Sequence, residues 1–124
     1  MREITGHRCG TGMDEHIRIE VANLDTSPGG ACAAYQFYIK ANGQWEKFAR
    51  VDFQKGPAEG GPPSGLSNEA LLAVVADRLQ GFQAGKYPCR ENAHAVAKIE
   101  EALHWLHART RDRAARGIEG TLLP

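Results

Sequence analysis

Residues 88–120 read PCRENAHAVAKIEEALHWLHARTRDRAARGIEG, and this stretch decides how the rest of the chain is organised. Neither Gly nor Pro occurs between Asn92 and Ala115, and Ala, Leu, Glu, Lys and Arg dominate. These residues lose little side-chain freedom in a helix, so the composition predicts one long helix. Its apolar residues recur at three- and four-residue spacing and form a single face: Ala95, Val96, Ile99, Ala102, Leu103 and Leu106.

The end of this predicted helix is strongly basic. Arg109, Arg111, Arg113 and Arg116 stand against one acidic residue, Asp112, and Gly117 follows where a C-terminal cap belongs. Of the four, Arg109, Arg113 and Arg116 share one side of the helix. One interpretation is structural, because the helix dipole favours cations at a C-terminus. The other is functional, because guanidinium groups bind phosphate through paired hydrogen bonds. The residues alone leave both open.

Length and composition limit the class of protein. A chain of 124 residues is expected to form one domain. Its formal net charge is +0, so general attraction to nucleic acid is not expected. Three widely spaced cysteines and the lack of an apolar signal segment in residues 1–10 predict a reducing, intracellular location. His7, Cys9 and His16 lack the paired spacing of zinc ligands, so neither a metal nor a cofactor is expected.

Residues 16–54 are predicted to form a β-sheet, whereas residues 1–15 are polar and glycine-containing and are expected to be irregular. Alternating apolar residues predict strands over residues 16–22, 31–41 and 44–54. Asn42 and Gly43 separate the last two strands and are typical of a type I′ hairpin turn. A sheet of three strands needs a cover for its apolar face, and we expect the helices downstream to supply it.

The second half of the chain predicts a helical hairpin. Residues 55–66 form a Gly/Pro-rich loop, and residues 67–117 form the hairpin, with Ser67 as the cap of the first helix. The apolar face of that helix is assigned to Leu72, Val75, Leu79 and Phe82. A short connection at residues 84–88 places the two helices antiparallel. The fold class is therefore α+β, a small antiparallel sheet followed by a C-terminal antiparallel α-hairpin.

The length of the second helix separates its two ends. Arg109 follows Asn92 by 17 residues, which is about 25 Å at a rise of 1.5 Å per residue. Phe82 lies near Asn92, across the connection. A ligand that touches both Phe82 and Arg109 therefore needs two hairpins packed antiparallel, which would create two equivalent sites per dimer. On the residues alone, Phe82 is better interpreted as a core residue than as a base-stacking one.

No catalytic motif occurs. The sequence contains no G-x-S-x-G, H-E-x-x-H, P-loop or G-x-G-x-x-G pattern. His104 and His107 lie on adjacent turns of the long helix, where solvated side chains are more common than ligands or bases. A non-enzymatic protein is therefore expected.

Three segments carry a family resemblance: residues 53–61 (FQKGPAEGG), 67–92 (SNEALLAVVADRLQGFQAGKYPCREN) and 99–121 (IEEALHWLHARTRDRAARGIEGT). In this order they resemble the Thoeris anti-defence type-one sponge family of phages, which shares its helical hairpin with the anti-CBASS cyclic-oligonucleotide sponge. The preceding sheet resembles the Thoeris sponge. The chain departs from the family at residues 62–65, Pro-Pro-Ser-Gly, where members commonly carry Asn-Gly.

The resemblance implies a function and a site. The protein would bind, without cleaving, a cyclic ADP-ribose isomer made by TIR immune sensors, in the cytoplasm of the infected bacterial host. Phe82 would stack on the adenine, Asn92 would hydrogen-bond the ligand, and Arg109 and Arg113 would hold the diphosphate. Further candidate ligand-binding residues are Arg116, Gln54 and Gly56. Similar members assemble as dimers and hexamers.

Three alternatives stay open at this point. The first is a sponge for CBASS cyclic di- or trinucleotides, which some family members hold at separate sites. The second is an enzyme that hydrolyses such signals. The third is a DNA- or RNA-binding helix that uses the arginines, and the neutral net charge argues against it.

Overall fold

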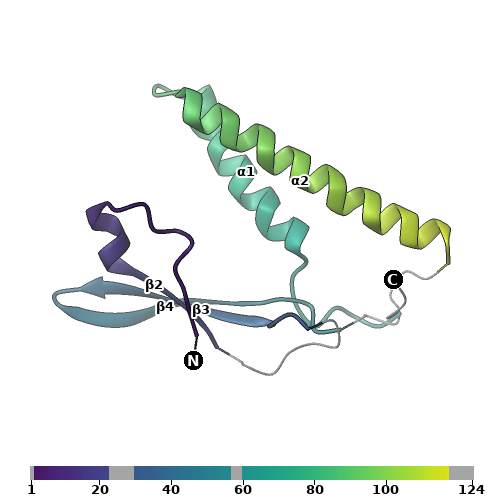
Figure 1. Ribbon diagram of the computed structural model, residues 1–124, viewed down its shortest axis with the longest axis horizontal. Helices are drawn as coiled ribbons and strands as arrows, with labels where there is room; N and C mark the ends of the chain where they lie inside the picture. Colours follow the sequence, from purple (N-terminus) through teal and green to yellow (C-terminus); the bar gives the residue numbers. More distant parts are fainter. Residues whose placement is uncertain (1, 23–29, 57–59, 118–124) are drawn as a thin grey trace. The chain divides into compact units, whose positions relative to one another are not determined.

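The computed structural model describes residues 2–22, 30–56 and 60–117, which form an antiparallel sheet followed by two helices (Figure 1). This confirms the α+β fold class. The chain divides into two compact units, Met1–Gly65 and Leu66–Pro124. In the described ranges, no helix has both the length and the apolar character needed to cross a membrane.

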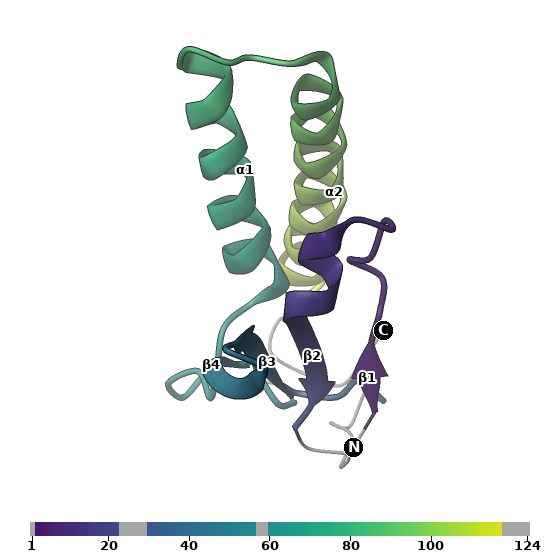
Figure 2. The same cartoon turned by 90° about the vertical axis from the view of Figure 1, so that its left-hand side faces the viewer.

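The first unit is a sheet of four strands in the order β1-β2-β3-β4, each antiparallel to its neighbour (Figure 2). The strands and the 3-10 helix η1 have these bounds: β1 Glu3–Ile4, η1 Gly12–His16, β2 Ile17–Val21, β3 Ala34–Ala41 and β4 Gln44–Asp52. The three predicted strands are confirmed. The expectation that residues 1–15 are irregular was wrong at β1 and η1, because elements this short leave no readable periodicity.

The β3–β4 hairpin contains a tight turn and a bulge. Asn42 and Gly43 have φ values of 53° and 77°, as a type I′ turn requires, which confirms the predicted turn. Further along, Phe37 pairs with Ala49 but Tyr38 pairs with Lys47, so Phe48 is an extra residue in β4. A bulge of this kind interrupts the alternation of side chains between the two faces.

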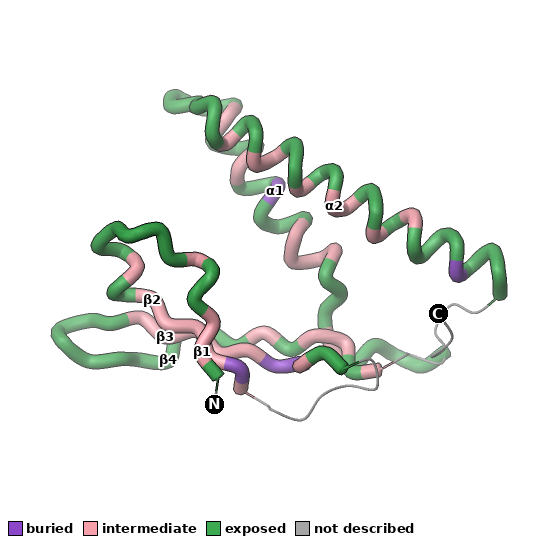
Figure 3. Tube along the Cα trace, in the orientation of Figure 1, coloured by how far each residue is buried: buried purple, intermediate pink, exposed green. Residues whose placement is uncertain are grey.

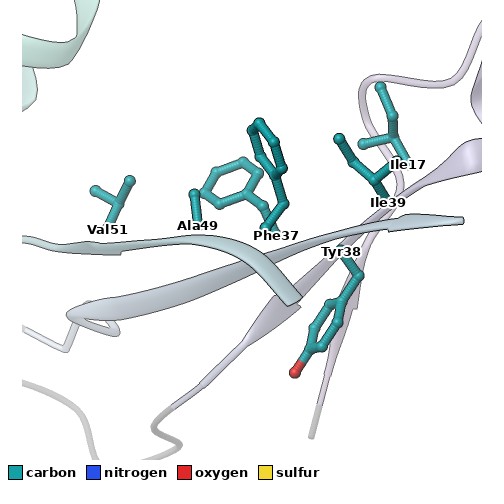
Figure 4. A pocket seen from close by; sticks show the side chains of 7 residues that line it. Ile17, Phe37, Tyr38, Ile39, Ala49 and Val51 are labelled. Carbon is teal, nitrogen blue, oxygen red and sulfur yellow. The ribbon is translucent and has the colours of Figure 1, made fainter. Parts of the chain in front are cut away.

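One face of the sheet is apolar. Ile17 pairs with Ile39 across β2 and β3, and Phe37 pairs with Ala49 across β3 and β4. These strands surround a shallow hollow of about 340 Å³ that is lined by Ile17, Phe37, Tyr38, Ile39, Phe48, Ala49 and Val51. In Figure 4 Phe37, Ile39, Ala49 and Val51 point to one side of the sheet and Tyr38 points to the other. The alternation expected from the sequence is therefore present.

The second unit is the predicted antiparallel hairpin of α1 (Asn68–Ala84) and α2 (Arg90–Ala115), which lie side by side in Figures 1 and 2. Ser67 caps α1, because its Oγ accepts a hydrogen bond from the Ala70 N–H at 3.1 Å. Gly117 follows α2 with a φ of 72°, the left-handed conformation of a C-terminal cap. Both caps were predicted from the sequence.

The buried face of α1 differs from the predicted one. Ala76 is buried and Leu72, Leu79 and Gln83 are half-buried, whereas Val75 and Phe82 are 42% and 46% exposed. At about 100° per residue, Val75 and Phe82 lie roughly 60° and 80° away from Leu72, on the flank of the helix. The interpretation of Phe82 as a core residue was therefore wrong.

The apolar face of α2 is confirmed. All six predicted residues are half-buried: Ala95, Val96, Ile99, Ala102, Leu103 and Leu106. Figure 3 shows half-buried positions recurring along α2 between exposed ones.

Candidate functional site

Phe82 lies near the end of α1 with an exposed ring. The Cζ atom of Arg78, one turn earlier on the same helix, lies 4.9 Å from the ring centroid. Phe82 is 46% exposed, so its side chain offers an apolar surface to solvent. Such a surface can stack on a nucleic acid base, because every base has a π-face.

A chain of hydrogen bonds links Phe82's end of α1 to Asn92. Gln83, the residue after Phe82, accepts a hydrogen bond at Oε1 from the Cys89 N–H at 2.9 Å. The Cys89 Sγ in turn accepts from the Asn92 N–H at 3.4 Å and caps α2. Asn92 is half-buried in the first turn of α2. The fold therefore places Phe82 and Asn92 at the same end of the hairpin.

The three arginines on one side of α2 have different surroundings. Arg109 is exposed. Arg113 is only 7% exposed. Arg116 is exposed and forms an ion pair with Asp112, at 3.4 Å between Nη1 and Oδ2. Arg109 is thus directly accessible to an anionic ligand, whereas Arg113 is covered and must become more accessible if it is to contact phosphate.

The two groups of candidate residues are not brought together within one chain. α2 runs without interruption from Arg90 to Ala115. Asn92 in its first turn and Arg109 near its end are therefore about 25 Å apart along the helix axis. One hairpin therefore carries two separate groups of candidate residues, Phe82 and Asn92 near the connection and the arginines at the opposite end.

Gln54 and Gly56 lie in the loop that follows β4, where a hydrogen bond joins them. The Gln54 Nε2 donates to the Gly56 carbonyl at 3.0 Å, and the Gln54 Oε1 accepts from the Ser64 N–H at 2.7 Å. The Ser64 Oγ accepts from the Lys55 N–H at 3.0 Å. The side-chain amide of Gln54 is therefore engaged in organising the loop. The segment at which the sequence departs from the resembling family, residues 62–65, supplies two of these three contacts through Ser64.

Sequence reasoning missed Arg78, which contacts Phe82, and Asp14, which organises the turn before η1. Arg78 could have been found from its four-residue spacing to Phe82, which places the two side chains on one helix face. Asp14 accepts backbone hydrogen bonds from Cys9, Gly10 and Thr11, at 2.7, 2.6 and 3.0 Å. No periodic pattern marks that contact.

Within residues 2–22, 30–56 and 60–117, no three His, Cys, Asp or Glu side chains gather closely enough to hold an ion. His7 instead approaches the Ile17 carbonyl with its Nε2 at 3.3 Å.

The hairpin is also recognised by comparison with known proteins. The family model described as Acb2/Tad1, hairpin domain, matches residues 46–111, which is more than half of the chain. The chain belongs to the Acb2/Tad1 hairpin domain family. The Acb2/Tad1 match begins in β4 and ends within α2, so it contains Gln54, Gly56, Phe82, Asn92 and Arg109. Arg113 and Arg116 lie beyond it.

A curated relative is named Thoeris anti-defense 1 and comes from Bacillus phage SBSphiJ7. It is 52% identical to this chain over 75 residues, which cover 60% of this chain and 53% of the relative. The chain thus matches about half the length of that relative.

Proposed function

We propose that this chain is a phage anti-defence protein that blocks Thoeris immunity by binding, without cleaving, a cyclic ADP-ribose-type signal made by TIR proteins. The observation that carries the proposal is the high identity to the relative named Thoeris anti-defense 1. The chemistry of the two half-sites supports it, since one offers an aromatic ring and an amide and the other offers guanidinium groups.

In the proposed site each ligand lies between two chains. Phe82 of one chain stacks on the adenine, and Asn92 of the same chain hydrogen-bonds the ligand. Arg109 and Arg113 of the second chain hold the diphosphate through charge-assisted hydrogen bonds. The distance of about 25 Å along α2 requires this division. An antiparallel pair of hairpins then forms two equivalent sites, and such dimers assemble further into hexamers.

The proposed protein acts by capture inside the infected host cell. A protein that sequesters a signal gains from slow release and needs no complementarity to a transition state. The signal then stays away from the effector that would otherwise shut down the cell.

Calorimetric titration with cyclic ADP-ribose isomers tests the proposal. The protein should bind one isomer tightly, and heating the complex should release that ligand chemically unchanged, as measured by chromatography. Arg109→Ala should abolish binding, whereas Arg111→Ala, which removes an exposed arginine on another side of α2, should not. Recovery of linear ADP-ribose would instead identify a hydrolase, and no binding of any isomer would contradict the proposal.

A second candidate is a sponge for CBASS cyclic di- or trinucleotides. The match to a hairpin domain described jointly for Acb2 and Tad1 favours this candidate. A cyclic trinucleotide should then bind whether or not the cyclic ADP-ribose site is filled, if the two ligands use separate sites. Competition between the two ligands would show that they share one.

A further inference from the structure

Arg78 and Phe82 form a stacked pair on α1. They are four residues apart, so their side chains lie on the same side of the helix one turn from each other. The Cζ atom of Arg78 lies 4.9 Å from the centroid of the Phe82 ring, within the range of a cation–π interaction. The guanidinium therefore covers one face of the ring, while 46% of Phe82 stays exposed.

Among the described residues, no neighbouring acid neutralises the charge of Arg78. In the part of the chain that the structure describes, no carboxylate forms an ion pair with Arg78. Asp77 precedes it directly, but consecutive side chains point about 100° apart on a helix. The Phe82 ring is thus the contact that orients this guanidinium.

The backbone beneath Phe82 is already fixed by other contacts. Its carbonyl accepts the Gly85 N–H at 3.2 Å, and the next residue, Gln83, accepts the Cys89 N–H at 2.9 Å. The remaining freedom lies in the two side-chain torsions of Phe82. A contact that restricts these torsions before the ligand arrives reduces the entropy lost on binding.

We infer that Arg78 is a positioning residue of the proposed nucleotide site, where its guanidinium holds the Phe82 ring from one face so that a purine base stacks on the other. Guanidinium, phenyl ring and base then form three layers. The inference rests on the proposed function, because it assigns Arg78 a role through Phe82 and none in direct contact with the ligand.

Calorimetric titration with the cyclic ADP-ribose isomer that the wild-type protein binds tests the inference. Arg78→Met keeps the length of the side chain and removes the charge, and it should weaken binding about tenfold. Arg78→Lys should bind more tightly than Arg78→Met and approach the wild-type affinity, because an ammonium group also interacts with a ring face. Lys86→Met is the matched control, since it removes one positive charge from the same end of the hairpin. An equal loss in Lys86→Met would show a general charge effect and overturn the inference.

A double-mutant cycle separates positioning from direct contact. In a Phe82→Leu background, Arg78→Met should have no further effect on affinity, because there is no ring to hold. A further tenfold loss there would place Arg78 on the ligand itself and overturn the inference.

Failure of the proposed function gives a different pattern. If the wild-type protein binds no isomer, the proposed function fails and the inference fails with it. If Arg109→Ala abolishes binding while Arg78→Met binds like the wild type, the proposed function stands and the inference alone is overturned.

Discussion

Asp14 organises the turn before η1 by accepting three backbone hydrogen bonds. The N–H of Cys9 contributes most to holding the pKa of Asp14 below its ordinary value, with the N–H groups of Gly10 and Thr11 and the charge of His7 adding to it. Folding thus favours the charged carboxylate. The resulting stability is complete above the unfolded-state pKa of roughly 3.9 and is lost as the pH falls through the folded-state pKa.

We therefore expect the amide resonances of Cys9, Gly10 and Thr11 to titrate with a midpoint below about 3.9 in an NMR pH series. Asp14→Asn should abolish this titration, since no carboxylate remains. A midpoint at or above the ordinary value of an aspartate would contradict the assignment.

Gly65 lies too close to the end of β4 for any side chain. A Cβ atom at this position would lie 2.5 Å from the carbonyl carbon and oxygen of Phe53, which are backbone atoms and cannot turn away. Gly65→Ala should lower the free energy of unfolding by about 1–3 kcal/mol. Denaturant titration followed by circular dichroism measures this change.

Gly81→Ala is the matched control. Nothing lies within 4 Å of a Cβ atom at Gly81, which is exposed inside α1. This substitution should stabilise the protein by about 0.5–1 kcal/mol, because Ala is a better helix former than Gly. Equal effects of the two substitutions would refute the close packing at Gly65.

At the scale of the elements, the α1–α2 connection depends on Gln83. Gln83→Ala leaves the Cys89 N–H without its side-chain acceptor and should cost about 1 kcal/mol of stability. The rate of hydrogen exchange at the Cys89 amide should rise by the factor that corresponds to this loss of stability.

Gln80→Ala is the comparison for this element. It removes an exposed hydrogen bond at 3.2 Å between the Gln80 Nε2 and Glu100 across the two helices. Because both groups are exposed, water replaces the lost contact, and the cost should be within about 0.5 kcal/mol. If Gln80→Ala destabilised the hairpin more than Gln83→Ala, the role given to Gln83 would be wrong.

The sequence predicted these elements well where a periodic pattern exists. Alternation identified β2, β3 and β4, and the spacing of Ile99, Ala102 and Leu106 identified the apolar face of α2. The same use of spacing wrongly placed Phe82 on the buried face of α1. Spacings of three and four residues are both compatible with one helix face, so they do not distinguish the centre of that face from its flank. Ala76, which is buried, has a small side chain, so its hydrophobicity does not mark it as a core residue in the sequence. The bulge at Phe48 and the hydrogen bonds of Asp14 depend on local geometry that no pattern encodes.

The candidate site was predictable only in part. The separation of Asn92 from Arg109 follows from helix length, which the sequence sets. The burial of Arg113 does not follow, because its spacing to Arg109 and Arg116 places all three on one side of the helix and says nothing of how exposed each one is. The covering of Phe82 by Arg78 likewise depends on the side-chain conformations that the fold selects.

At the scale of the whole molecule, the proposed division of the site between two chains predicts complementation between inactive variants. A chain with Phe82→Ala and Asn92→Ala lacks one half-site, and a chain with Arg109→Ala lacks the other. Neither variant alone should bind a cyclic ADP-ribose isomer. Co-expression with different affinity tags should yield mixed dimers that bind one ligand per dimer, half of the wild-type capacity.

Calorimetry on the doubly purified mixed species measures this stoichiometry. The control is a dimer purified in the same way through two different tags, in which both chains carry Arg109→Ala. This dimer should bind no ligand. Mixed dimers without any binding would show that the residues do not combine across chains.

Under the proposed function, the unbroken course of α2 between the two proposed half-sites also has a kinetic consequence early in infection. If a complete site needs two chains, its abundance grows with the square of the chain concentration while dimers are scarce, and linearly once they dominate. Signal removal would then begin abruptly at a threshold of protein synthesis instead of rising in proportion to it. The dimerisation constant, more than the affinity of the finished site, would set how soon after infection the host signal is silenced.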